Sequence, residues 1–331
     1  MISLVVPVYN VKPYVNEFLD SVINQTFQDF EAVLVDDGSN DGTETVLDEY
    51  AEKFPKLRVI HKQNEGVVRT WKLGIKQAKG EYLAFADPDD ILKPNMLEIL
   101  HNLMTENAAD LVITGITRLE NGQIYDTPAD GWNLSEGLYS GEKLKEIKDN
   151  LFGNTENRDN IFFFARWNKL FKKELLLKNL DFSDDRVKFG DDVCMCAAAI
   201  YDSEKLYYSH TPLYIYRIRN DSLTTVKFNT AEMDNALYLR DSVRRMISEK
   251  GYMNEFIYYN DPSYHIVRVM RKINQTSNAK SEKKQFLRAW KFHEYVAQYD
   301  LKKAKKYISG RRYLVIWLLK HSFYSLLLKI L

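Results

Sequence analysis

The chain has 331 residues, of which 45% are apolar and 13% aromatic, and its formal net charge is zero. This apolar content is sufficient for a packed core and excludes a disordered chain, and the length suits one large domain with a smaller one. Residues 265–331 carry 16 Lys and Arg against 3 Asp and Glu, a net charge of +13 that leaves −13 on the remainder. A basic C-terminal region predicts an anionic partner, either a membrane surface or nucleic acid.

The first hundred residues alternate strand and helix signals. Buried strands are predicted at "ISLVVPVYN", "FEAVLVDDGS", "LRVIHK" and "EYLAFAD", with helices between them. Such repeats predict a mainly parallel sheet with right-handed crossovers and with ligands at the carboxyl ends of the strands. Two acidic turns, Asp36–Asp37 and Asp87–Asp90, follow two of these strands.

The pattern is more mixed after residue 95. A helix is predicted over 95–109, a strand at "ADLVITGITRL" and an irregular excursion over 119–140. Helices are predicted around "RWNKLFKKELL" and "FGDDVCMCAAAIY", and a strand at "LYYSHTPLYIYRI". From Thr230 onward the pattern is helical, with turn signals only at "YNDPSY" and "ISGRR". The predicted fold class is α/β: a Rossmann-like, mainly parallel sheet flanked by helices, followed by a mostly helical C-terminal region.

The two cysteines of the chain, Cys194 and Cys196, are two positions apart. Residues so placed in a regular helix or strand do not form a sound disulfide, and no secretory leader precedes Ser3. We therefore expect a reducing, cytoplasmic location. Because a zinc site needs more ligands than Cys-Met-Cys offers, both cysteines are predicted to be buried helix residues.

The stretch "FADPDD", residues 85–90, has two interpretations. Asp and Pro are common turn residues, and Asp89 or Asp90 could cap the following helix. However, gathered carboxylates repel one another unless a cation neutralises them, and hard divalent cations bridge carboxylates to substrate phosphates. The second acidic turn, "VDDGS", at the end of a neighbouring strand favours a cation site.

The blocks "SLVVPVYNVKPYVNEFLDSVINQTFQDFEAVLVDDGSNDGT", "NEG" and "AKGEYLAFADPDD" occur in this order. Together they resemble the nucleotide-sugar domain of family 2 inverting glycosyltransferases with the GT-A fold, of the type that builds bacterial cell-envelope polysaccharides. The resemblance covers residues 1–115 and resumes over 165–225. It implies a GT-A domain at 1–225, with a nucleotide-sugar half (1–115) and an acceptor half (116–225), before a basic helical region at 226–331.

The resemblance implies a role for each matching residue of the nucleotide site. Tyr9 would stack on uracil beside Pro7, and Asp37, with Asp36 next to it, would hydrogen-bond the base. Asn64, in "QNEG", would lie near the ribose and uracil.

The resemblance also implies a divalent metal site for Mg²⁺ or Mn²⁺ in the Asp-x-Asp motif. Asp89 would be the direct ligand, Asp87 would contact ribose, the metal or a metal-bound water, and Asp90 would support the donor sugar or the metal surroundings. Arg217 or Arg219, with Ser222, would meet the diphosphate. A divalent ion there would stabilise the charge that develops on the leaving diphosphate.

The block "KFGDDVCMC" resembles the family's Gly-Glu-Asp block at the start of a helix. An inverting transfer needs a base that takes the proton of the acceptor hydroxyl, and Asp192 matches that aspartate. Asp191 replaces the usual glutamate on the acceptor side. The alternative for Asp192 is a helix N-cap. Asp184 and Asp185, just upstream, are predicted to form a surface turn.

Three further features have two interpretations each. Trp167, Asn168 and Lys169 in "RWNKLFKKELL" match an acceptor-side block, but an amphipathic surface helix explains them equally well. Trp71 in "VVRTWKLG" stands where many relatives have an arginine that faces the donor, with Lys72 in place of an asparagine; plain packing of Trp71 is the alternative. His210 is a site candidate, although a lone histidine is more often structural.

The C-terminal stretch "RRYLVIWLLKHSFYSLLLKIL" is not a membrane span, because its apolar run Tyr313–Leu319 is far shorter than the ~20 residues required. Its polar residues Arg311, Ser322, Ser325 and Lys329 cluster on one side of a helix, which resembles an interfacial helix. The preceding "LKKAKKY" would add attraction to anionic lipid, so residues 301–331 are predicted to contact a membrane surface. The alternative is packing on its own domain or in a homo-oligomer. Nucleic acid is disfavoured because no recognised binding module accompanies the charge.

The predicted function is a metal-dependent inverting glycosyltransferase that moves a sugar from a nucleotide-sugar donor, UDP-linked, to a saccharide acceptor on a lipid carrier. It would act in cell-envelope polysaccharide synthesis at the inner face of the cell membrane. The alternative is a non-catalytic partner subunit of a glycosyltransferase complex. Its only support is that Trp71 and Asp191 replace the residues usual in the family. The presence of Asp37, Asp89 and Asp192 argues against that alternative.

Overall fold

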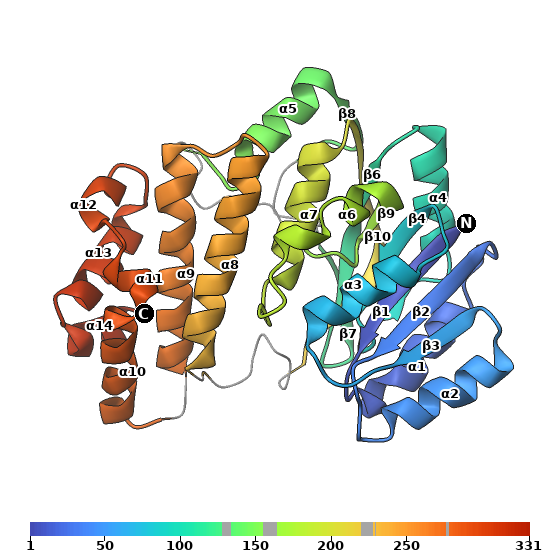
Figure 1. Ribbon diagram of the computed structural model, residues 1–331, viewed down its shortest axis with the longest axis horizontal. Helices are drawn as coiled ribbons and strands as arrows, with labels where there is room; N and C mark the ends of the chain where they lie inside the picture. Colours follow the sequence, from blue (N-terminus) through green and yellow to red (C-terminus); the bar gives the residue numbers. More distant parts are fainter. Residues whose placement is uncertain (128–133, 155–163, 220–227, 229, 276–277) are drawn as a thin grey trace. The chain divides into compact units, whose positions relative to one another are not determined.

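The computed structural model describes residues 1–127, 134–154, 164–219, 228, 230–275 and 278–331 (Figure 1). The chain forms two compact units. The first comprises Met1–Asp149 and Phe162–Arg219, and the second comprises Asn150–Ile161 and Asn220–Leu331.

The first unit is built on a mixed sheet whose first four strands are parallel in the order β3-β2-β1-β4. These strands are β1 (Ile2–Val8), β2 (Phe30–Asp36), β3 (Leu57–His61) and β4 (Tyr82–Phe85). The chain moves outward from β1 through β2 to β3 and then returns to place β4 on the other side of β1. The carboxyl ends of β1 and β4 therefore lie at a topological switch point, where ligands of such sheets bind.

The second part of the sheet is mostly antiparallel. β9 (Lys169–Lys172) runs antiparallel between β4 and β6 (Leu111–Glu120), β10 (Lys205–Arg217) runs parallel to β6, and β5 (Ile91–Leu92) is antiparallel to β10. Two further strands, β7 (Gln123–Thr127) and β8 (Gly137–Ser140), pair with β6 and β10.

Helices cover both faces of the sheet. One face packs α1 (Lys12–Ile23), α2 (Thr43–Lys53) and α4 (Met96–Glu106) against alternate side chains of β1 such as Leu4 and Val6. α3 (Val67–Gln77) lies on the other face, where a Cβ on Gly74 would collide with Val5. The unit is completed by α5 (Gly141–Asn150), α6 (Lys173–Leu177), the 3₁₀ turn Leu180–Phe182 and α7 (Asp191–Asp202).

Pro7 sits in the middle of the sheet because β4 has already ended beside it. β4 pairs with β1 only from Ile2 to Val5, and Ala86 donates to the Val5 carbonyl. Pro7 follows Val5 by two residues, so its missing N–H faces the space that β4 has left. β1 and β4 therefore separate at their carboxyl ends.

The segment "RWNKLFKKELL" was predicted as helix, and this is wrong for its centre. Lys169–Lys172 form β9, and the helix begins only at Lys173. Leu170 and Phe171 are completely buried between β4 and β6. The apolar run is too short for its periodicity to indicate a helix or a strand, so burial between these two strands determines its conformation.

The second unit is entirely helical over its described residues, as predicted from Thr230 onward. Its helices are α8 (Ala231–Glu249), α9 (Glu255–Gln275), α10 (Lys280–Phe292), α11 (Glu294–Ala297), α12 (Leu301–Ala304), α13 (Gly310–Lys320) and α14 (Tyr324–Ile330). Within the described residues, no helix has both the length and the apolar character that crossing a membrane requires.

The predicted turn at "YNDPSY" is wrong, because α9 continues through Pro262. Proline removes the helical hydrogen bond to the carbonyl four residues earlier, that of Tyr258. Arg244 of α8 donates from Nη2 to this carbonyl at 3.2 Å. A tertiary contact therefore satisfies the group that the proline leaves open.

The C-terminal stretch packs into the core of this unit. Ile316 and Leu319 of α13 and Leu327 of α14 are completely buried in one cluster with Trp290. The polar residues predicted to share a helix side are exposed, as are Leu314, Phe323 and Leu326. Of the two interpretations of the stretch, internal packing accounts for most of its apolar side chains.

Candidate active site

The two carboxylates of the acidic turn after β2, those of Asp36 and Asp37, make different contacts. Asp36 is buried; its Oδ1 accepts from the Ser39 N–H at 3.0 Å and its Oδ2 lies 2.9 Å from His61 Nδ1. The hydrogen bond that His61 donates to Asp36 raises the pKa of His61. Asp36 therefore fixes the turn to the end of β3.

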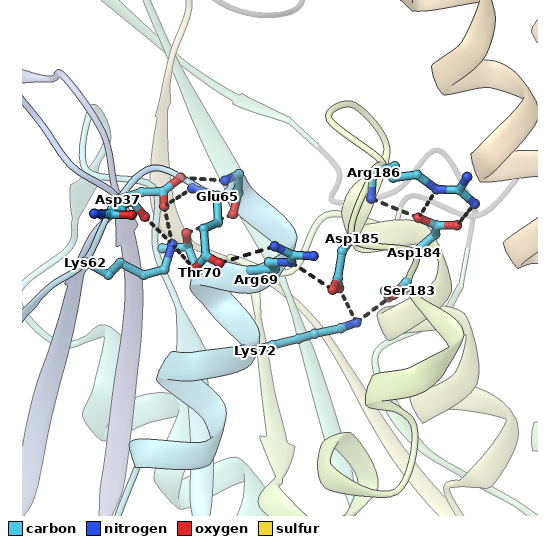
Figure 2. A network of polar contacts seen from close by, with 12 residues as sticks. Asp37, Lys62, Glu65, Arg69, Thr70, Lys72, Ser183, Asp184, Asp185 and Arg186 are labelled. Carbon is cyan, nitrogen blue, oxygen red and sulfur yellow. Dashed lines mark hydrogen bonds and ion pairs between the residues drawn. The ribbon is translucent and has the colours of Figure 1, made fainter.

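Asp37 folds the loop between β3 and α3 over the end of β2. Its Oδ1 accepts from the Glu65 N–H at 2.9 Å and from Lys62 Nζ, and its Oδ2 accepts from the Gly66 N–H at 2.9 Å (Figure 2). Gly38, with φ of +75°, approaches this loop so closely that a Cβ would lie 3.0 Å from the Asn64 nitrogen. The structure thus brings together residues that the sequence placed in two separate motifs.

Tyr9 lies beside this turn with 49% of its surface exposed. The following residue, Asn10, donates its N–H to Ser39 Oγ at 3.0 Å and accepts from the Asn40 N–H at 2.9 Å. An exposed ring beside Asp37 is the arrangement expected for stacking on a base, and base binding by Tyr9 and Pro7 stays a prediction.

The loop after β4 is anchored to β10 through Asp90. This buried carboxylate accepts from the Tyr214 hydroxyl at 2.8 Å and from the Arg217 N–H at 2.7 Å. Tyr214 Oη in turn accepts from the Asp87 N–H at 2.9 Å. Burial, together with the nearby Asp89 and Asp87, raises the pKa of Asp90. Asp90 therefore positions the loop, and its contact with donor stays a prediction.

The two arginines proposed for the diphosphate lie at the same loop. Arg217 donates from Nε to the Asp89 carbonyl at 2.9 Å, and Arg219 Nη2 lies 2.9 Å from Asp89 Oδ2. Both guanidinium groups lie over the ring of Tyr14, and Arg217 also pairs with Glu17 at 2.6 Å. This loop thus joins carboxylates with two cations that could meet an incoming anion.

Sequence reasoning missed Arg166, which joins the two acidic blocks. Only 7% of its side chain is exposed; Nη2 lies 3.2 Å from Asp87 Oδ1 and Nη1 lies 2.5 Å from Asp191 Oδ2. Its Nε is buried without a hydrogen-bond partner among the described residues. One guanidinium thus holds the loop after β4 against the start of α7. The signal available was the arginine that begins the block "RWNKLFKKELL", which was interpreted either as an acceptor-side block or as a surface helix.

Trp71 is both packed and hydrogen-bonded. Its side chain is completely buried, and Nε1 donates to Asp191 Oδ2 at 3.0 Å. The neighbouring cations Arg69 and Lys72 instead pair with Asp185, at 3.0 and 2.7 Å (Figure 2). The positive charge next to Asp191 therefore comes from Arg166 rather than from α3.

Asp192 lies at the start of α7, and its role as the base stays a prediction. Burial, and then the charge of Asp191, raises the pKa of Asp192 to about 7. Burial likewise raises the pKa of Asp87 to about 6, with Asp89 and Asp191 adding to the shift and Arg166 opposing it. Gly190 is the N-cap of α7, so the N-cap interpretation of Asp192 is wrong.

The acceptor-side candidates are buried in the described structure. Trp167 stacks on Tyr214 with ring centroids 4.5 Å apart, and Lys169 donates from Nζ to the Ala165 carbonyl at 2.6 Å and to Asn168 Oδ1 at 2.8 Å. These contacts support the sheet beneath the site, and contact with an acceptor stays a prediction. Cys194 and Cys196 are buried helix residues, as predicted.

The donor atoms of the Asp-x-Asp loop fit a divalent cation. Asp87 and Asp89 offer carboxylate oxygens in one loop, and Mg²⁺ is commonly held by one or two carboxylates that substrate phosphates complement. Among the described residues, no group of three or more His, Cys, Asp or Glu could hold a metal ion. A metal at this loop would therefore need oxygens from the substrate.

The parallel part of the sheet carries carboxylates at its switch point, the edge at which open α/β proteins bind their ligands. The family model "Glycosyl transferase family 2" matches residues 3–180. The glycosyltransferase GlyG of Streptococcus pneumoniae is 33% identical over 236 residues, 69% of this chain and 74% of that protein. The uncharacterized glycosyltransferase EpsJ of Bacillus subtilis is 29% identical over 261 residues, 78% of this chain and 70% of that protein. The chain belongs to glycosyltransferase family 2, which confirms the resemblance and the enzyme class.

Two solved structures share the fold. S. aureus TarS 1–349 in complex with UDP-GlcNAc has a TM-score of 0.68 at 17% identity, covering 99% of this chain and 90% of that one. The mannosyltransferase PcManGT from Pyrobaculum calidifontis, in complex with GDP-Man and Mn²⁺, has a TM-score of 0.51 at 15% identity, covering 97% and 86%. The α/β sheet with flanking helices and a helical C-terminal region confirms the predicted fold class.

Proposed function

We propose that this enzyme transfers a sugar, with inversion, from a UDP-sugar to a saccharide acceptor on a lipid carrier in cell-envelope polysaccharide synthesis. The observation that carries the proposal is Arg166, whose guanidinium pairs with both Asp87 and Asp191. It holds the loop proposed for the donor diphosphate against the helix that carries the proposed base.

The donor would bind along the carboxyl ends of β1, β2 and β4. The exposed ring of Tyr9 would stack on the base, and Asp37 retains lone pairs that could accept from it, because its two oxygens accept three hydrogen bonds from the loop. Arg217 and Arg219 would face the diphosphate from β10 and the residues after it. The UDP-GlcNAc complex of the TarS neighbour supports this type of donor.

A divalent cation, Mn²⁺ or Mg²⁺, would be held by Asp87 and Asp89. The ion would supply Lewis-acid stabilisation of the negative charge on the leaving diphosphate. The chain itself orders this loop, because Asp90 ties it to Tyr214 and Arg166 holds Asp87. The Mn²⁺ in the PcManGT neighbour supports the choice of ion.

Asp192 would accept the proton of the acceptor hydroxyl as the anomeric bond forms on the face opposite the leaving group. A pKa of about 7 matches this task, since the carboxylate is then both ionised and basic enough near neutral pH. Asp191 would position this end of the helix, because its carboxylate accepts from Arg166 and from Trp71 Nε1 and so keeps the start of α7 in place.

The proposals for the acceptor and for the location rest on similar proteins and on the net charge of the C-terminal region. The minor teichoic acid biosynthesis protein GgaB of Bacillus subtilis is 28% identical over 241 residues, 71% of this chain but 25% of that protein. The net charge of +13 over residues 265–331 suits contact with anionic lipid at the inner face of the cell membrane.

The test compares two variants by calorimetry with UDP and Mn²⁺ and by turnover of UDP-sugars. Asp89→Ala should lose metal-dependent UDP binding, whereas Asp192→Asn should bind UDP normally and lose transfer by about 10²-fold or more. Asp29→Asn is the matched control, because this exposed carboxylate lies at the opposite, amino-terminal end of β2. Normal transfer by Asp192→Asn would refute its assignment as the base.

A further inference from the structure

The C-terminal unit contains a hollow of about 600 Å³ at the start of α9 and along residues 302–307. Two of its lining residues are aromatic, here called its floor: the rings of Tyr259 and Tyr307 stack with centroids 5.4 Å apart and planes 5° apart. The Tyr307 hydroxyl donates to Glu255, which also pairs with Lys306 at 3.2 Å. The floor is therefore fixed by contacts between two separate segments of the same unit.

Four of the residues that line this hollow are lysines, here called the rim lysines. Lys302, Lys303 and Lys305 line it together with Lys306. Over the described residues, of these four only Lys306 forms a salt bridge with a carboxylate, that of Glu255, whose pKa the charge of Lys303 also lowers. All four lysines are exposed. Four lysines against the single carboxylate of Glu255 leave an excess of positive charge, whose repulsion costs free energy that a bound anion would remove.

The backbone that carries these lysines is anchored, which keeps them at the rim. Ala304 and Leu301 are buried in the core cluster of the unit, and Asp300 caps this helical turn by accepting from the Lys303 N–H at 3.0 Å. Lys306 lies over the Tyr307 ring, 4.5 Å from its centroid. The backbone that carries the four lysines is therefore fixed where these residues line the hollow.

We propose that this lysine hollow binds a phosphate-bearing group, with the anion at the rim lysines and the adjoining part of the ligand on the stacked tyrosines. Lysines act on phosphates as point charges, and the volume matches that of small-ligand sites. Leu314, Phe323 and Leu326, large apolar side chains of the same unit, are exposed by about half, as is typical where a protein meets lipid. A phospholipid headgroup is thus the favoured source, and a soluble phosphate compound is the other.

This inference deepens the membrane contact in the proposed function and rests on it, but not on the transfer chemistry. The test measures flotation of the full chain with vesicles of phosphatidylcholine alone and of equimolar phosphatidylglycerol and phosphatidylcholine. The variant Lys302→Ala/Lys303→Ala/Lys305→Ala should bind the anionic vesicles about tenfold to a hundredfold more weakly. Binding to neutral vesicles should stay low for both proteins.

The matched control is Lys280→Ala/Lys284→Ala/Arg288→Ala, which removes the same charge from α10 of the same unit. The control should retain binding, and equal losses in the two triple variants would overturn a local site in favour of diffuse charge attraction. Calorimetry with inorganic phosphate and pyrophosphate forms the second arm. Binding there that the rim variant loses would assign the hollow to a soluble phosphate compound; absence of binding in both arms would overturn the proposal.

A third variant should strengthen binding, which a folding defect cannot imitate. Glu255→Gln keeps an acceptor for Tyr307 and Lys306 but removes the one carboxylate of the hollow, so anionic vesicles should bind more tightly. Unchanged or weaker binding would count against the hollow as the site. Hydrolysis of UDP-sugar without vesicles separates the two proposals, because the rim variant should match the unmodified protein there. An unmodified protein that hydrolyses no donor would refute the transferase proposal alone.

Discussion

Arg166 carries a buried guanidinium between two carboxylates that are far apart in sequence. Its planar fork reaches Asp87 through one nitrogen and Asp191 through the other, whereas a lysine offers a single charged centre. We expect Arg166→Lys to retain one pair at most, to lower the free energy of unfolding by about 1–3 kcal/mol and to reduce transfer by at least about tenfold. Urea unfolding and initial rates measure the two effects.

Arg186→Lys provides the control for this substitution. Arg186 pairs with Asp184 at 2.6 Å but 64% of its side chain is exposed, so the change should alter stability by less than about 0.5 kcal/mol. If Arg166→Lys behaved like this control in both assays, the guanidinium would have no positioning role.

The raised pKa of Asp192 predicts how the rate of transfer depends on pH. Its pKa is raised to about 7, and a base works only when ionised, so kcat/KM should rise with pH and level off above about 7. Below the pKa the rate should fall about tenfold per pH unit. The measurement is kcat/KM at saturating Mn²⁺ between about pH 5 and pH 9, with unfolding followed in parallel. A rate that is constant across this range would exclude Asp192 as the base.

At the scale of elements, α3 is tied to the segment before α7 by one polar network (Figure 2). Asp185 accepts from Arg69 Nε at 3.0 Å and pairs with Lys72 at 2.7 Å, and Lys72 also donates to the Ser183 carbonyl at 2.7 Å. Through Glu65 the same network reaches Lys62 and Asp37. The nucleotide turn and the approach to the proposed base are thus held by shared side chains.

Asp185→Asn should loosen the 183–190 segment with little effect on global stability. The pairs are partly exposed, so the loss in the free energy of unfolding should be below about 1 kcal/mol. Amide hydrogen exchange over residues 183–190 should accelerate, because local opening no longer breaks these contacts. Asp149→Asn, which breaks the exposed pair with Lys145, is the control. Equal exchange in the two variants would show that the network does not hold the segment.

The sequence predicted those elements that are locally consistent. The strands β1 to β4 are buried runs between helices, so their order and the acidic turns Asp36–Asp37 and Asp87–Asp90 could be placed at the carboxyl edge. β9 could not be, because a four-residue run becomes a strand only through its neighbours β4 and β6. The prediction of a turn at Pro262 was wrong for the same reason. Arg244, which satisfies the carbonyl that the proline leaves open, comes from another helix.

In the candidate site, too, residues within a motif could be predicted from the sequence, and residues placed by long-range contacts could not. Motifs predicted roles for Asp37, Asp87 and Asp192, because single residues in a characteristic order suffice for such a match. Arg166 has no motif of its own in this chain, and its role follows from contacts with two distant loops. The hydrogen bond from Trp71 to Asp191 likewise spans 120 residues, and no local pattern contains it.

At the scale of the whole molecule, the C-terminal stretch combines buried core residues with the exposed residues proposed to contact lipid, and a sequence pattern does not separate the two. Ile316 is completely buried in the core of the second unit, while Leu314, two residues earlier on α13, is 49% exposed. Deleting residues 301–331 would therefore remove core side chains as well as the proposed lipid contacts, and loss of flotation would have two explanations.

Two single substitutions on α13 separate these roles. Ile316→Ala should lower the free energy of unfolding by about 2–5 kcal/mol, because it opens a cavity, and Leu314→Ala should lower it by less than about 1 kcal/mol. Vesicle binding should show the reverse order under conditions where both variants are folded: Leu314→Ala should weaken binding and Ile316→Ala should not. Thermal unfolding and flotation on the same preparations give the comparison. A variant pair in which Ile316→Ala alone reduces flotation, with unchanged stability, would mean that α13 inserts its core-facing side into lipid, contrary to the packing seen around Trp290 and Leu319.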